Sequence, residues 1–286
     1  MPKPLVFFLT LALAACSPLT SVLPDGVTQY DLSSGKALDA RRAARAAGVY
    51  ASWRAIVDGS EQAVSIVRFN PRKMKADIVT AAGMEADSTG ALCARYGAVA
   101  GINGSYFDTR ALTPATFVKD EGVVVGETST SELFRTNGVV TLSGKRIGVD
   151  AIDTILTYDT VEEALASGPV LIDEGNAFSY IERIQQPDTF FERRHPRSVI
   201  GQDAKGNVWL IVVDGRAPGE ADGMTISELT SLCLQLGLTD ALNLDGGGSS
   251  TLWTERGGVI NHPCDNRRFD HSDQRKVPNA IIIHAR

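Results

Sequence analysis

The segment ALNLDGGGSST, residues 241–251, places a carboxylate, three consecutive glycines and several hydroxyl groups directly after a short apolar run. On a strand, Leu242 and Leu244 would face one side, and Asn243 and Asp245 the other. Glycine loses the most freedom on folding, so three in a row indicate a backbone that another group must approach closely. The segment therefore predicts the floor of a site, with Asp245 as its key carboxylate. The residues expected to contact a ligand there are Gly246, Gly247, Gly248 and Ser249.

Two further polar groups follow apolar runs. In GINGSYFD, Asn103 precedes two aromatic residues, and an amide beside an aromatic face suits a sugar, although an Asn-Gly turn has the same pattern. In NVWLIVVDG, Asp214 and Gly215 end a strongly apolar run. An acid at the carboxyl end of a strand commonly lies on the ligand side of a sheet, although this pair is also a common turn. Asp214 is the second candidate for a catalytic carboxylate.

Basic residues cluster in FFERRHPRSVIG, within a chain whose formal net charge is −6. Arg193 and Arg194 read as a solvated loop, whereas Arg197 leads directly into an apolar strand and is expected to point into a site. The guanidinium fork suits a phosphate or a carboxylate. The late segment NHPCDNRRFDHSDQRKVPN contains His262 but no regular metal-ligand spacing, so we predict no metal site.

The amino terminus has the pattern of an export signal. Lys3 is followed by the apolar run LVFFLTLALAA and then by Cys16, a run too short for a mature membrane span. Leu13 to Cys16 resembles the lipobox of bacterial lipoproteins, in which the cysteine becomes the lipidated first residue. An ordinary signal peptide is the alternative. Ser17 is not a retention signal of the Asp type, so in a Gram-negative cell the lipid anchor would favour the outer membrane.

The rest of the chain reads as one α+β domain with a mixed sheet and packed helices. We expect a signal peptide over 1–15, a tether with a short Ala/Arg helix over 16–45, and the domain over 46–286. Helices are predicted at 88–97, at 160–169 and at 225–237; the last two show the capping-box spacings of Thr160 with Glu163 and of Thr225 with Glu228. Strands are predicted around 49–80, at 207–215, at 240–245 and at 279–285.

Three cysteines remain after Cys16, namely Cys93, Cys233 and Cys264. One disulfide with a free thiol, or no disulfide, are both compatible with this number. Cys233 falls on the apolar stripe of a predicted helix and is expected to be packed rather than reactive. The acidic net charge argues against nucleic acid as a general partner.

Six motifs in this order resemble the phosphodiester glycosidase domain: INGSYFD, SGPVLI, RSVIGQDAKGNVWLIVVDGR, GMTISEL, DALNLDGGGSST and RKVPNAIII. The resemblance runs from about residue 95 to 286. It implies hydrolysis of the bond between a sugar's anomeric carbon and a phosphodiester, in envelope or extracellular glycans, without a cofactor. It also implies that the site is formed by Asn103, Ser167, Gly168, Arg197, Asp214, Gly215 and residues 245–249. Ser105 stands where the family usually has glycine.

Two other functions use the same residues. A metal-dependent phosphodiesterase would cut the P–O bond with Asp214, Asp245 and His262. A non-catalytic lipoprotein would bind an envelope glycan and never release a free sugar. The identity of the sugar, the role of each carboxylate and the oligomeric state are left open by the sequence.

Overall fold

The computed structural model describes residues 27–31, 36–38, 48–57, 60–81, 86–152, 158, 160–178 and 189–285, with backbone only for those before residue 60. The predicted signal peptide, Cys16 and most of the predicted tether lie outside these ranges. The first two residues of the Ala/Arg stretch belong to a strand, β2 (Lys36–Leu38), rather than to a helix.

Three β-sheets organise the described chain. The largest, sheet I, has the strand order β16-β15-β19-β17-β18-β4-β3-β1-β2. Its strands are β1 (Val27–Asp31), β2, β3 (Gly48–Val57), β4 (Ser60–Phe69), β15 (Val170–Asp173), β16 (Asn176–Ala177), β17 (Arg197–Asp203), β18 (Val208–Val213) and β19 (Leu238–Asn243). Among the described pairs only β1 with β3 is parallel.

Sheets II and III each contain five strands in the described part of the chain. Sheet II is formed by β11 (Val123–Gly126), β10 (Val118–Asp120), β14 (Glu163–Ser167), β12 (Gly138–Ser143) and β13 (Arg146–Ala151). Sheet III is formed by β21 (Gly258–Val259), β20 (Leu252–Thr254), β7 (Ala100–Asn103), β23 (Asn279–Ala285) and β5 (Met74–Thr80). Two short ribbons pair β6 (Asp87–Ser88) with β22 (Lys276–Val277), and β8 (Phe107–Asp108) with β9 (Thr113–Pro114).

The helices are α1 (Thr89–Arg95), α2 (Thr189–Glu192) and α3 (Ile226–Gln235), with a 3-10 turn at Gly247–Ser249. The predicted helix at 225–237 is confirmed as α3, including its capping box between Thr225 and Glu228. The predicted helix at 88–97 is confirmed as α1. The predicted helix at 160–169 is wrong, because these residues contain strand β14, which pairs with both β10 and β12.

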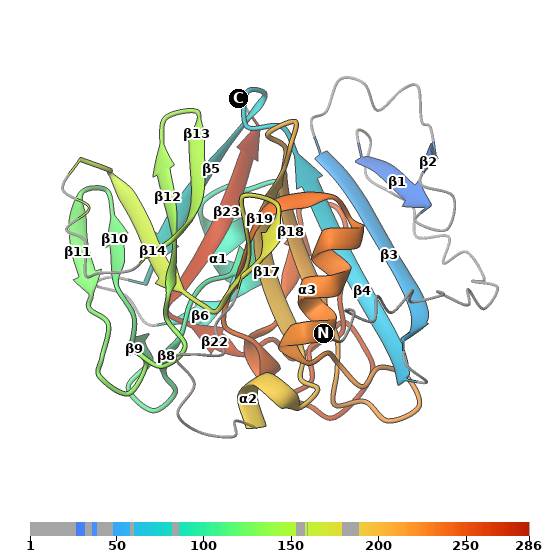
Figure 1. Cartoon of the computed structure of the whole chain (residues 1–286). Coiled ribbons are helices and arrows are strands. Elements are labelled where there is room, and N and C mark those ends of the chain that lie inside the picture. The colour runs from blue at the N-terminus through green and yellow to red at the C-terminus, as the bar shows by residue number, and fades with distance from the viewer. Residues whose placement is uncertain are drawn as a thin grey trace, which may run out of the picture.

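Sheet I is buried on both faces around β18. Val208, Leu210 and Val212 pack into the core shared with sheets II and III, whereas Trp209 and Ile211 face α3. Figure 1 shows α3 lying across β17, β18 and β19. The predicted α+β class is confirmed, although several sheets replace the single mixed sheet that we expected.

The turns between strands gather at two opposite ends of the molecule. At one end, which we call the site end, β7, β14, β18 and β19 finish and β17 and β23 begin. At the other, β4, β12, β17 and β23 finish and β5, β13 and β18 begin. In Figure 1 the second end is at the top beside the carboxyl terminus, and the site end lies below it near α2. The antiparallel pairing therefore brings distant segments together at each end.

Candidate active site

The residues predicted for a site gather at the site end. Asn103 ends β7, Ser167 ends β14, Asp214 follows β18, Asp245 follows β19 with Leu244 between, and Arg197 begins β17. Leu244 lies in the core and Asn243 points the other way, into a buried polar network, as the alternation predicts. Five segments of the chain that are far apart in the sequence thus supply one region.

The backbone of Asp245 is held on both sides. Its N–H donates to the carbonyl oxygen of Gly104 at 3.1 Å, and its own carbonyl oxygen accepts from the Asn103 amide at 2.7 Å. Its carboxylate accepts from the N–H of Gly246 at 2.9 Å, and the residue as a whole is half-buried. These hydrogen bonds fix the backbone from which the Asp245 carboxylate projects.

The pKa of Asp245 is raised to about 6, chiefly because burial disfavours the charged form. The Ser249 hydroxyl, the guanidinium groups of Arg135 and Arg275, and the N–H of Gly246 act in the opposite direction. A carboxyl group that titrates near neutral pH can exchange a proton with a substrate or a water molecule.

The guanidinium groups of two arginines lie against the glycine turn. A Cβ atom on Gly247 would lie 3.0 Å from a guanidinium nitrogen of Arg216, and one on Gly248 would overlap Asp265 and Arg275. Gly247 also has a φ of 62°, which favours glycine. Arg275 is held by two hydrogen bonds to Asp265, of 2.7 and 2.8 Å. The glycines therefore make room for cationic side chains.

The N–H groups of this turn are largely used within the protein. Gly246 donates to the Asp245 carboxylate, and Gly247 donates to the carbonyl oxygen of Pro196 at 2.9 Å. We predicted that Gly246, Gly247, Gly248 and Ser249 contact a ligand. The hydrogen bonds of Gly246 and Gly247 hold the turn, and Arg216 and Arg275 lie against it; contact of the turn with a ligand stays a prediction.

Arg135 is a second cation beside Asp245, after Arg275, and it comes from a loop that sequence reasoning missed. Its guanidinium lies 3.7 Å from the centre of the Tyr106 ring and makes an ion pair of 2.6 Å with Glu132. It is close enough to Asp245 to lower the pKa of that carboxyl group. No pattern marked it, because it lies in an irregular segment between β11 and β12.

Gly168 supports the position of Arg135. A Cβ atom on Gly168 would overlap the carbonyl oxygen of Arg135, so the two backbones touch. The carbonyl oxygen of Gly168 accepts from the Tyr106 hydroxyl and from the Asn243 amide. Ser167 beside it is fully buried. Gly168 therefore shapes the wall of the site, whereas the Ser167 hydroxyl has no hydrogen-bond partner among the described residues, and the contacts of both with a substrate stay predictions.

Arg197 is only 1% exposed. Its guanidinium donates to the carbonyl oxygens of Met224 at 2.9 Å, Phe190 at 2.5 Å and Arg193 at 3.1 Å. The side chain does point inward, as the sequence indicates, but it braces α2 and the start of α3. Its buried hydrogen bonds suit a positioning role better than a direct grip on phosphate.

Asn103 is likewise buried and saturated. Its carbonyl oxygen accepts from the Ser198 hydroxyl at 2.8 Å and from the N–H of Thr251 at 3.1 Å, and its amide donates to Asp245. Ser105, the departure from the usual family pattern, is buried and bonds Thr116. Asn103 therefore ties β7, β17 and the glycine turn together rather than presenting its amide to a sugar.

Asp214 is 1% exposed and holds His262. Its Oδ1 accepts from the Asn261 amide and from the N–H of His262, both at 2.9 Å, and its Oδ2 lies 2.8 Å from Nδ1 of His262. The His262 ring stacks on Phe269 at 3.7 Å. Gly215 follows in close contact with Gly223 and Pro196. Asp214 thus orients an imidazole and is covered by it.

The described residues contain no group of three or more His, Cys, Asp or Glu side chains placed to hold a metal ion. In the same residues no helix has the length and apolar character needed to cross a membrane. Cys93, Cys233 and Cys264 are all free of disulfides, and Cys233 lies on the buried face of α3, where it is packed, as expected.

Comparison with known proteins shows the family. The sequence profile of the phosphodiester glycosidase family matches residues 96–284, well over half of the chain. The chain belongs to the phosphodiester glycosidase family. Bovine N-acetylglucosamine-1-phosphodiester alpha-N-acetylglucosaminidase is 30% identical over 124 residues, which is 42% of this chain and 23% of the bovine protein. The matched part therefore spans about a quarter of that relative.

Two further comparisons show similarity in sequence and in fold. The Bacillus subtilis prophage-derived protein YomE is 43% identical over 72 residues, 25% of this chain and 11% of that protein. The catalytic domain of the zebrafish N-acetylglucosamine-1-phosphodiester alpha-N-acetylglucosaminidase, auto-inhibited by its pro-peptide, superposes with a TM-score of 0.65 at 19% identity. That likeness covers 84% of this chain and 83% of the zebrafish one, and it supports the fold.

Proposed function

We propose that this member of the phosphodiester glycosidase family hydrolyses the bond between a sugar's anomeric carbon and a phosphodiester. The observation that carries the proposal is the Asp245 carboxyl, with a pKa of about 6, beside Arg135 and Arg275. A carboxyl that titrates near neutrality and cations that fit a phosphate are the two groups that this reaction requires.

The arginines would bind the phosphodiester. Arg135 and Arg275 influence Asp245 directly, and Arg216 lies over Gly247 on the same turn. Arg275 is oriented by Asp265 and Arg135 by Glu132 and the Tyr106 ring, so their positions are set before a ligand arrives. Pre-positioned cations stabilise the charge that grows on the departing phosphate.

In the proposed step, a water oxygen forms a bond to the anomeric carbon while the bond from that carbon to the phosphate oxygen breaks. The phosphate keeps the electron pair and leaves as a phosphomonoester anion. Asp245, in its ionised form, accepts a proton from the water. Because a phosphate is a weak base, it leaves without a strong general acid, unlike the alkoxide of an ordinary glycoside.

Asp214 acts in this proposal through His262. Its carboxylate accepts a hydrogen bond from Nδ1–H; this fixes the ring and, in the neutral imidazole, leaves Nε2 as the nitrogen that can accept a hydrogen bond. We assign Asp214 as a positioning residue and Asp245 as the catalytic residue. This assignment replaces the pair of catalytic carboxylates expected from the sequence.

A panel of sugar-1-phosphodiesters, varied in sugar and anomer, tests the reaction through the release of reducing sugar. Hydrolysis in ¹⁸O-labelled water should place the label in the sugar. Label in the phosphate, with inhibition by a chelator, would instead support the metal-dependent phosphodiesterase. Stoichiometric binding without release of sugar across the whole panel would support a glycan-binding lipoprotein.

We also propose that the protein is anchored by lipid at Cys16 in the cell envelope, on the outer membrane in a Gram-negative cell, where it would meet envelope glycans. The support is the lipobox-like segment Leu13–Cys16 with Ser17 after it. The full chain should partition into the detergent phase of a Triton X-114 separation, and Cys16→Ser should move it to the aqueous phase. An unchanged distribution of the variant would contradict the anchor.

A further inference from the structure

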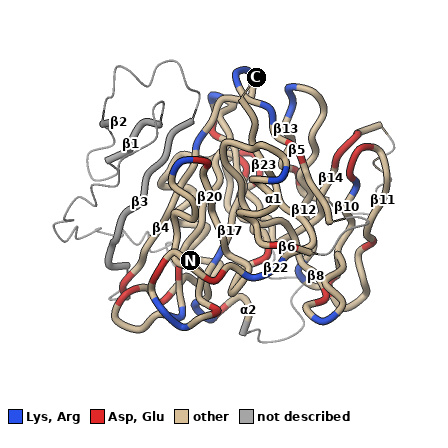
Figure 2. The backbone as a smooth tube through the Cα atoms, turned by 180° about the vertical axis from the view of Figure 1, so that it is seen from behind, with Lys and Arg blue, Asp and Glu red and all other residues tan. Residues whose placement is uncertain are grey.

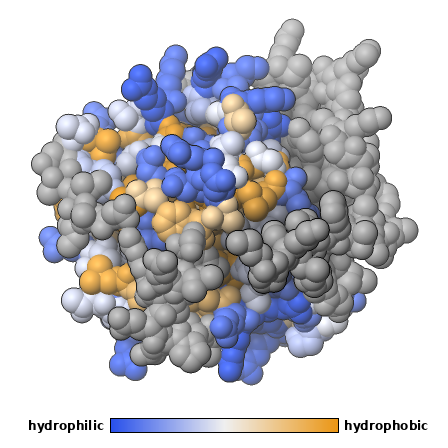
Figure 3. Space-filling view, viewed as in Figure 1, coloured by the Kyte–Doolittle hydropathy of each residue, from blue (hydrophilic) through white to orange (hydrophobic). Residues whose placement is uncertain are grey.

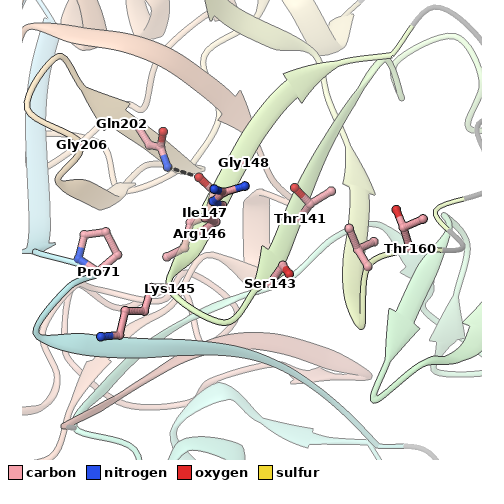
Figure 4. A pocket seen from close by; sticks show the side chains of 11 residues that line it. Pro71, Thr141, Ser143, Lys145, Arg146, Ile147, Gly148, Thr160, Gln202 and Gly206 are labelled. Atoms are coloured by element: carbon pink, nitrogen blue, oxygen red, sulfur yellow. Dashed lines mark hydrogen bonds between the residues drawn. The ribbon is translucent and has the colours of Figure 1, made fainter.

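An open groove of about 600 Å³ lies at the end of the molecule opposite Asp245. Figure 4 shows its lining from the β12–β13 hairpin and from the turns after β4 and β17. Thr141, Ser143, Lys145 and Arg146 line it on one side, and Pro71 and Gln202 line it on the other. The lining is therefore rich in hydroxyl, amide and cationic groups.

The groove has a fixed floor. Ser143 pairs with Arg146 across a tight turn in which Gly144 has a φ of 61°, so the hairpin tip is short and well defined. The Gln202 amide donates to the carbonyl oxygen of Ile147, which ties this hairpin to β17. The two sides of the groove belong to different sheets but are joined by this hydrogen bond (Figure 4).

Cations from three turns surround the groove. Lys145 and Arg146 line it directly, and Arg72, Lys73 and Lys205 stand on the turns that carry Pro71 and Gly206. All five side chains are exposed, and within the described part of the chain none of them forms an ion pair. Figure 2 shows Lys and Arg segments at the end that carries the carboxyl terminus and the β13 hairpin, and Figure 3 shows a hydrophilic upper edge there.

Few acids oppose these cations. Asp203 is occupied by Asn207, Trp209 and Arg68, so its charge is already compensated. Glu162 and Asp150 are exposed acids near the rim, beside Val161 and Gly148, and the half-buried Asp173 and Asp240 lie close enough to Asp150 to raise the pKa of its carboxyl group. A local excess of positive charge on a chain of net charge −6 is a distribution that selects an anionic ligand.

We propose that this groove is a second binding site, for an acidic saccharide carrying phosphate or carboxylate groups. The hydroxyl and amide groups match sugar hydroxyls, and the cations match the acidic substituents. Because the lining that includes Thr141 is recessed, it suits a saccharide chain better than the flat surface of a lipid bilayer. From Arg197 at the site end to Gln202 is five residues of β17, or roughly 17 Å, so the groove is separate from Asp245.

Titration calorimetry at fixed ionic strength tests the proposal on the intact protein. The probes are oligogalacturonate, glucose 6-phosphate, inorganic phosphate and the neutral maltohexaose. The double variant Lys145→Glu with Arg146→Glu should bind oligogalacturonate at least tenfold more weakly. Hydrolysis of a small sugar-1-phosphodiester by this variant should be unchanged. The matched control is Arg110→Glu with Lys276→Glu, which makes the same charge change on exposed residues outside the groove.

The outcomes separate the groove from the proposed reaction. Asp245→Asn should keep full affinity for oligogalacturonate, so binding is measured whether or not the chain hydrolyses anything. Equal weakening by the groove and control variants would reduce the effect to net charge and overturn the proposal. It would also be overturned if inorganic phosphate bound as tightly as the saccharides, or if anionic vesicles bound and saccharides did not. Thermal unfolding checks folding, and the milder Lys145→Gln with Arg146→Gln should show a smaller loss in the same direction.

Discussion

Asp214 contacts His262 twice, through Nδ1 of the ring at 2.8 Å and through the backbone N–H at 2.9 Å. One carboxylate therefore fixes both the ring and the main chain of the same residue. Because Asp214 is almost completely buried, it can reach a substrate only through this imidazole.

Asp214→Asn should lower kcat at least tenfold, because the amide can present an N–H to Nδ1 and so favour the wrong tautomer. His262→Ala should lose about as much, and the double variant should lose little more than either single one. Steady-state kinetics of the two single variants and the double variant form a double-mutant cycle that measures this coupling. Losses that multiply would show that the two residues act separately.

Asp245→Asn should abolish activity and stabilise the fold at neutral pH. The folded pKa of about 6 lies above the ordinary value of 3.8, so the unfolded chain ionises first as the pH rises, and stability falls between pH 4 and 6. A difference of about 2 pKa units corresponds to about 3 kcal/mol. Chemical denaturation should show this gain at pH 8 and none at pH 3.5. A gain that is equal at both pH values would contradict burial of the ionised carboxylate as its cause.

The pH dependence of kcat/KM distinguishes two roles of Asp245. As a base it must be ionised, so kcat/KM should rise tenfold per pH unit below about pH 6 and level off above it. A fall of kcat/KM above pH 6 would instead make Asp245 the general acid. The substrate's phosphodiester stays ionised throughout this range, so it does not disturb the profile.

The stereochemistry of the product follows from the number of accessible carboxylates. Of the three aspartates nearest the reaction, Asp214 is covered by His262 and Asp265 is bonded to Arg275, which leaves Asp245. Direct attack by water then inverts the anomeric configuration. Proton NMR of the freshly released sugar measures this, and retention would require a covalent intermediate on a carboxylate.

Two glycines should respond differently to alanine. Gly248→Ala would push against the ends of Asp265 and Arg275, which are flexible, so we expect KM to rise at least tenfold with little change in Tm. Gly168→Ala would meet the backbone of Arg135, which cannot swing away, so Tm should fall by several degrees. Kinetics and thermal unfolding of both variants test the contrast. A similar effect of both on Tm would contradict it.

The sequence predicted elements whose information is local. Helix α3 carries its own cap in Thr225 and Glu228, and the run before Asp214 is apolar enough to be a strand in any setting. The pattern of Thr160 with Glu163 misled us because the same residues form a short strand once β10 and β12 pair with it. Those partners are distant in sequence, so no local pattern indicates them.

In the candidate site too, local sequence patterns predicted some residues, whereas the roles of others depend on contacts with distant segments. Asp245 was marked by its glycines, which can be seen in the sequence. Whether Asn103 and Arg197 contact a substrate or brace the backbone depends on neighbours from other strands, and the structure shows carbonyl groups around Arg197. Arg135 had no signal at all, because its position near Asp245 arises from the contact of its backbone with Gly168.

Because β18 is buried on both faces, the distance between the two ends of the molecule is fixed. A slip by one residue would exchange Trp209 with Leu210 between two packed cores, so β18 cannot slide against its neighbours. Both ends of the molecule are therefore held at a constant separation, roughly 17 Å along β17. A single saccharide can contact the groove and Asp245 together only if it is longer than that strand. The rigid core therefore sets a minimum length for a saccharide that binds at both places.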